Sequence, residues 1–88
     1  MIEGKTKSGF EFAISEEVLD DFKTFKYLQK VDRGDISYMM DAMVRVLGEE
    51  QEEALEAHML KVNGDIKTSD MFSEFKEILE STKTGKNS

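Results

Sequence analysis

The sequence predicts a mostly helical α+β domain, in which an N-terminal β-hairpin packs on a bundle of about four short helices. Apolar residues alternate with polar ones near the N-terminus, and they recur at every third or fourth position over the rest of the chain. The chain contains no proline, so six glycines are left to divide it into elements. We expect one domain over residues 1–82 and a disordered tail over residues 83–88, which carry no apolar side chain.

The composition narrows the function classes. With 88 residues, 39% of them hydrophobic and 35% charged, the chain suits a compact soluble domain better than a disordered one. Its net charge of -7 repels phosphate groups, so we expect no nucleic-acid partner. It has no cysteine, which excludes a disulfide, a thiol nucleophile and a thiolate metal site. No apolar run approaches the roughly 18 residues of a membrane span and no signal peptide is visible, so we expect no membrane association.

Residues 1–14 predict the hairpin. Three apolar residues alternate with Glu11 and Ala13, which puts them on one face of a strand: Phe10, Phe12 and Ile14. Gly9 supplies the turn because it tolerates a positive φ. A lone hairpin is marginally stable in water, so its apolar face must lie on the helices.

The first helix is predicted to begin after Ser15, a good N-cap, and to run to about Val31. Its apolar stripe comprises Val18, Leu19, Phe22, Phe25, Leu28 and Val31. A basic stripe on the other side, which we interpret as a solvated face, comprises Lys23, Lys26 and Lys30.

The second helix is predicted from Ile36 to Leu47, after a corner at Gly34. It is rich in methionine, an adaptable residue that is common on surfaces that fit several partners. The pattern alone favours core packing for these side chains: Met39, Met40 and Met43. Asp41 and Arg45 are spaced to form an ion pair on the exposed side.

Gly48 predicts the end of this helix, and an acidic helix follows from Glu49 to Lys61. Its first turn holds four glutamates, which suit the positive end of the helix dipole: Glu49, Glu50, Glu52 and Glu53. We expect them to be solvated on the outer face. The inner face should comprise Gln51, Leu55, His58, Met59 and Val62.

A turn at Asn63-Gly64-Asp65 separates the last helix, which should begin after Thr68 or Ser69 and end near Thr82. Its predicted apolar face comprises Met71, Phe72, Phe75, Ile78 and Leu79.

No residue pattern indicates catalysis, so we expect neither an enzyme nor a bound metal or cofactor. His58 is the single histidine and lies in an apolar stripe, which favours a partly buried structural role. The turn after it resembles the second half of a calcium loop. However, the first ligand positions would be Met59 and Lys61, which do not bind calcium.

Small acidic helical chains of this kind also resemble acyl carrier proteins, in which the modified serine directly follows an aspartate. Here Ile36 separates Asp35 from Ser37. This departure disfavours phosphopantetheine attachment, and the acyl-carrier interpretation ranks last.

Four segments together resemble a known family: Phe10–Phe22, Lys30–Asp35, Leu47–Leu55 and Phe75–Glu80. Their order is similar to that in the small tail assembly chaperones of long-tailed phages and prophages of Gram-positive bacteria. The resemblance covers about residues 1–82, and its motifs are structural rather than catalytic.

The resemblance implies a non-enzymatic assembly factor in the bacterial host cytoplasm that is absent from the mature virion. It would bind the tape measure protein, keep that protein's apolar helices soluble, and help recruit major tail protein. The candidate contacts are Met39, Met40 and Met43, with Phe72 and Phe75 second. A small acidic adaptor or regulatory protein is the alternative, and a homo-oligomer stays open. Many members also have a longer frameshifted form, and Gly85-Lys86 is compatible with a slippery codon pair, which the gene sequence would decide.

Overall fold

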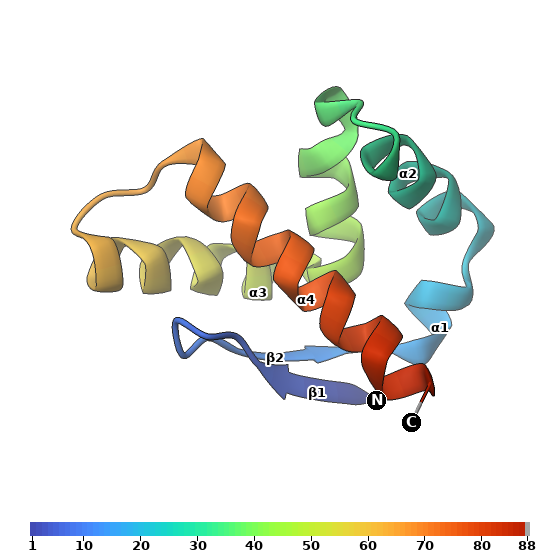
Figure 1. Ribbon diagram of the computed structural model, residues 1–88, viewed down its shortest axis with the longest axis horizontal. Helices are drawn as coiled ribbons and strands as arrows, with labels where there is room; N and C mark the ends of the chain where they lie inside the picture. The colour runs from blue at the N-terminus through green and yellow to red at the C-terminus, as the bar shows by residue number, and fades with distance from the viewer. Residues whose placement is uncertain (88) are drawn as a thin grey trace.

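The computed structural model describes residues 1–87, with side chains described for residues 1–82. It confirms the predicted fold class, a two-stranded hairpin with a mostly helical remainder (Figure 1). The elements are β1 Ile2–Lys5, β2 Glu11–Ile14, α1 Glu16–Asp20, α2 Phe22–Asp32, the 3-10 turn η1 Ile36–Tyr38, α3 Met39–Asn63 and α4 Thr68–Asn87. None of the helices within this described part is long and apolar enough to cross a membrane.

The hairpin forms as the alternation predicts. β1 and β2 are antiparallel, with Ile2 opposite Ile14. Gly9 has φ +98°, so the turn adopts a backbone conformation that other residues avoid. The three apolar side chains on one face of this hairpin are buried, as predicted: Phe10, Phe12 and Ile14.

The prediction of a single first helix up to Val31 is wrong, because the helix is interrupted at Asp21. This residue is extended, with φ -73° and ψ 131°, and its carboxylate accepts a 3.0 Å hydrogen bond from the Thr24 N–H. Aspartate is a strong N-cap, so α2 starts anew there and turns Thr24 towards the interior. Phe22 and Phe25 consequently lie on the exposed side of α2 and not in an apolar stripe.

α3 consists of two helical segments that meet at Gly48, as the predicted stop requires. Gly48 has φ +82° and ψ 158°, a combination essentially restricted to glycine. It does not have the left-handed helical conformation in which a glycine commonly ends a helix, and the next helical segment follows without a loop. Figure 1 shows α3 changing direction sharply at this corner.

α4 begins at Thr68, earlier than predicted, because this residue is already helical and does not precede the helix as its cap. The backbone is helical through Asn87. The predicted end near Thr82 is therefore too early, and the segment predicted as a disordered tail is helical up to that residue. Ser88 lies outside the described residues.

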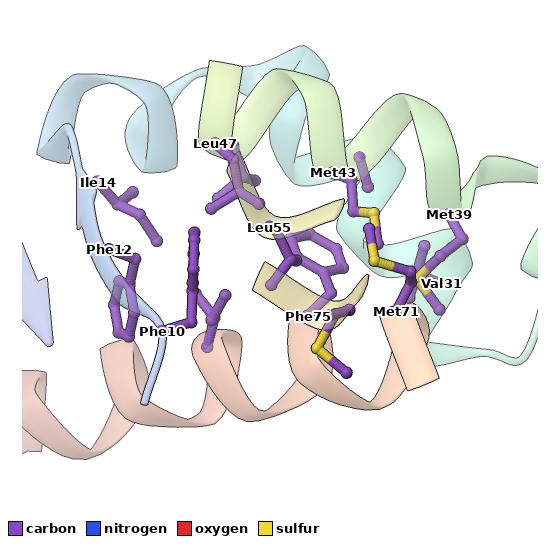
Figure 2. Packing of buried hydrophobic residues seen from close by; sticks show 14 residues of the cluster. Phe10, Phe12, Ile14, Val31, Met39, Met43, Leu47, Leu55, Met71 and Phe75 are labelled. Atoms are coloured by element: carbon purple, nitrogen blue, oxygen red, sulfur yellow. The ribbon is translucent and has the colours of Figure 1, made fainter. Parts of the chain in front are cut away.

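One apolar core joins the hairpin to the helices (Figure 2). Leu55 of α3 and Phe75 of α4 lie at its centre, and both are fully buried. The hairpin residues close one end of the core, and the other end is closed by Val31, Met39 and Met71. The α4 face predicted from periodicity is confirmed: Met71, Phe75 and Ile78 are buried, and Phe72 and Leu79 pack against them.

Candidate functional site: an apolar groove at the corner of α3

An open groove lies where the two segments of α3 meet the start of α4. Its cavity volume is about 200 Å³. Sites for drug-sized ligands and cofactors usually measure about 300–1,000 Å³, so this groove suits a few side chains of a partner better than a cofactor. The groove lining comprises Met40, Glu52, Glu56, Ile66, Thr68, Met71 and Phe72.

Two glycines create the groove. The corner at Gly48 places the segment that carries Met40 beside the segment that carries Glu52. Gly64, with φ +80°, ends α3 in the left-handed conformation, and the chain then turns back past Ile66 into α4. Both of these apolar side chains remain in water, since Met40 is 51% exposed and Ile66 is 43% exposed. Clustered exposed apolar side chains are typical of interaction sites.

The five predicted contact residues divide into two sets. Met40 and Phe72 both line the groove, one from α3 and one from α4. The other three belong to the core, where at most 1% of each side chain is exposed: Met39, Met43 and Phe75. These three side chains are therefore part of the core and not of an exposed contact surface.

Sequence reasoning missed the other five groove residues as contacts: Glu52, Glu56, Ile66, Thr68 and Met71. A large apolar residue isolated among the polar residues of a turn was the available signal for Ile66. The two glutamates carried no comparable signal, because they look like the other glutamates of an acidic helix.

Glu52 was expected on the solvated outer face, but only 7% of it is exposed. Burial raises the pKa of its carboxyl to about 7, and a hydrogen bond with Glu56 and the nearby charges of Glu56, Glu53 and Glu49 act in the same direction. The other groove residues carry no charge. Near neutral pH, the groove therefore holds a carboxyl pair that lacks a cation among the groove residues.

His58 has a structural role, as its position in the stripe suggested. Its Nε2 lies 3.0 Å from the Ser8 hydroxyl and 3.1 Å from the Ser8 carbonyl oxygen. The same hydroxyl donates to the Glu74 carboxylate at 2.9 Å. These contacts fasten the hairpin turn to α3 and α4.

We had expected Arg45 to form an ion pair with Asp41, but it does not. Its guanidinium contacts the Asp21 carboxylate at 3.2 Å, and its Nε donates to the Thr24 hydroxyl at 3.0 Å. The pKa of Asp21 is lowered, first by the hydrogen bond from the Thr24 backbone and then by that from Arg45. These residues line a second, more open concavity together with Glu17 and Val18. Arg45 and Asp21 pair with each other there, and Glu17 supplies the other charge of the lining.

Ser37, the residue weighed for acyl-carrier chemistry, caps a local turn. Its hydroxyl donates to the Asp35 carboxylate at 2.5 Å, and its N–H donates to the same oxygen. These bonds are the N-cap of η1 and give the serine a structural role.

No protein-family model matches the chain, and no curated protein and no solved structure is similar enough to count as a relative. The groove is therefore interpreted from its own geometry and from the resemblance that the sequence carries.

Proposed function

We propose that this protein is a phage tail assembly chaperone that binds apolar helical segments of the tape measure protein in the groove. It keeps that partner soluble in the host cytoplasm and assists the polymerisation of major tail protein around it. It catalyses no reaction and is absent from the mature virion. The observation that carries the proposal is the open apolar groove between Met40, Ile66 and Phe72.

The groove suits the side chains of a helix. Its apolar groups come from three separate segments, with Met40 on α3, Ile66 on the connection and Phe72 on α4. A helix presents apolar side chains at every third or fourth position, which a groove lined from separate segments can receive. Two of the lining residues are methionines, Met40 and Met71, whose flexible side chains adapt to different apolar shapes.

The small size of the groove suits a chaperone that must release its client. Tightly bound complexes usually bury about 1,200–2,000 Å² of surface, far more than a groove of this volume covers. Binding at one segment is therefore weak and reversible, and several copies are needed along a long client. The net charge of -7 would keep such a complex soluble.

The test is co-expression with the tape measure protein of the same genome, followed by measurement of the soluble and co-purified fractions. We expect the partner to become soluble and to co-purify with the native chain. Met40→Asp and Ile66→Asp should abolish both effects because they place a charge in the groove. Leu60→Asp is the matched control, since Leu60 is 50% exposed and lies outside the groove.

Two results would contradict the proposal. A tape measure protein that stays insoluble and unbound would remove the chaperone function and favour a small acidic adaptor with another partner. Equal loss of binding in the Leu60→Asp control would remove the groove as the contact site.

A further inference from the structure

The exposed side of α2 carries an aromatic and basic surface. Phe22 and Phe25 are 73% and 51% exposed, and their rings stack with centroids 6.4 Å apart. Lys26 lies one helical turn after Phe22, and Lys23 borders the same side. We call these four residues the α2 ridge.

The fold does not use the α2 ridge. The interior face of α2 is formed by Thr24 and Val31, which are buried. Both lysines of the ridge are exposed, and the acidic residue just before it, Asp21, is already paired with Arg45. The ridge is thus a local basic and apolar surface on a chain with a net charge of -7.

The groove has the complementary character. It presents Met40, Ile66 and Phe72 as apolar groups, and Glu52 and Glu56 as acidic ones. Methionine makes favourable contacts with aromatic rings, and a lysine beside a carboxyl pair supplies the cation that the groove lacks. The pKa of Glu52 is raised by burial and by the neighbouring carboxyl groups, and a docked ammonium group would lower it.

We propose that the α2 ridge of one copy docks in the groove of a second copy. Phe22 and Phe25 enter between the apolar side chains, while Lys23 and Lys26 face the two glutamates. The ridge and the groove are different surfaces of one chain, so the contact is head-to-tail, and a docked pair leaves one ridge and one groove free.

This inference goes beyond the proposed function, because it concerns the chain without a client. Docking removes the exposed phenylalanines and the groove from water at the same time. An occupied groove cannot receive a tape measure helix, so self-association and client binding compete for one site.

Sedimentation of the purified chain over a wide concentration range provides the test. We expect a mass above the 10.1 kDa of one chain that rises with concentration. A ridge variant, Phe22→Ser with Phe25→Ser, and a groove variant, Met40→Asp, should each remain monomeric. Both change exposed residues, so their unfolding temperatures should match that of the native chain.

Mixing the two variants distinguishes this contact from others. The ridge variant keeps a native groove and the groove variant keeps a native ridge, so the mixture should form a heterodimer and stop there. A second pair tests the charges: Lys26→Glu should weaken association at least about tenfold, and adding Glu56→Lys should restore part of it.

A native chain that stays monomeric at all concentrations overturns the inference, as does a mixture of variants that does not associate. Either result leaves the proposed function standing, because co-purification of the tape measure protein is measured separately. A monomer that still solubilises this client would show that the groove serves the client alone.

Discussion

The side-chain amide of Gln51 makes both hydrogen bonds that the backbone of Ala13 offers at the outer edge of β2. The Ala13 N–H donates to the amide oxygen at 2.8 Å, and the amide nitrogen donates to the Ala13 carbonyl oxygen at 2.7 Å. The same nitrogen reaches the carbonyl oxygen of Leu47, just before the corner of α3. Gln51 therefore acts in place of a third strand and ties the hairpin to the corner that shapes the groove.

Replacing Gln51 by alanine should lower the free energy of unfolding by about 2 kcal/mol. The substitution leaves two half-buried backbone groups of Ala13 without partners, and each such loss costs about 1 kcal/mol or more. Urea denaturation of this variant and of Glu50→Ala, an exposed neighbour, makes the comparison. Equal losses in the two variants would show that the amide bonds add nothing.

Substitution by asparagine should lower the stability of the protein more at Gly48 than at Gly64. Both have positive φ and open space around the Cβ position, so only the backbone conformation differs. Gly64 is left-handed helical, with ψ -7°, which asparagine tolerates, whereas ψ is 158° at Gly48. We expect Gly48→Asn to cost about 2 kcal/mol and Gly64→Asn about 1 kcal/mol or less in thermal or chemical unfolding. Similar costs would contradict this assignment of the corner.

Glu52 should make the protein less stable as the pH rises from about 4.5 to about 7. Its pKa is 4.5 in a model peptide and about 7 in the folded chain, so the folded state binds more protons between these values. The free energy of unfolding therefore falls through this window. Glu52→Gln should remove that fall and stabilise the protein by about 2 kcal/mol at pH 8. Denaturation at several pH values checks this, with the exposed Glu50→Gln as the control, which should retain the native slope because Glu50 is not among the groups that shift the pKa of Glu52.

Alanine substitutions at Met40 and Met43 should have different effects on binding and on stability. Met43 is fully buried, so Met43→Ala should cost about 2–5 kcal/mol. Met40 is half exposed in the groove, and Met40→Ala should cost under about 1 kcal/mol while weakening client binding. Denaturation and pull-down of the two variants make the measurement. Unchanged client binding in Met40→Ala would remove this methionine from the contact surface.

The elements that local patterns control could be predicted from the sequence. Alternation at Phe10, Phe12 and Ile14 predicted the buried hairpin face, because successive strand residues point to opposite sides. Periodicity likewise predicted the buried face of α4. Gly48 predicted an interruption of the helix, although the pattern gave no indication of its ψ angle.

Some features depend on which of two local signals prevails, or on where the fold places a residue. These features could not be predicted. Phe22 and Phe25 fit a helical stripe, and the capping bond at Asp21 outweighs that pattern locally. Glu52 and Glu53 are chemically identical, and only the tertiary fold distinguishes them, by burying the first and leaving the second exposed. The pattern of the methionine-rich segment favoured core packing for Met40, which is exposed in the structure. The same segment also contains Met39 and Met43, which are buried in the core.

Photo-crosslinking from position 40 tests the central claim most directly. A photoreactive phenylalanine analogue replaces Met40 during co-expression with the tape measure protein, and a second sample carries it at Leu60, which is equally exposed outside the groove. The groove account predicts a crosslinked band with the mass of this chain plus the tape measure protein from position 40, and little or none from position 60. Co-purification of the two proteins with no crosslink from position 40 would contradict it.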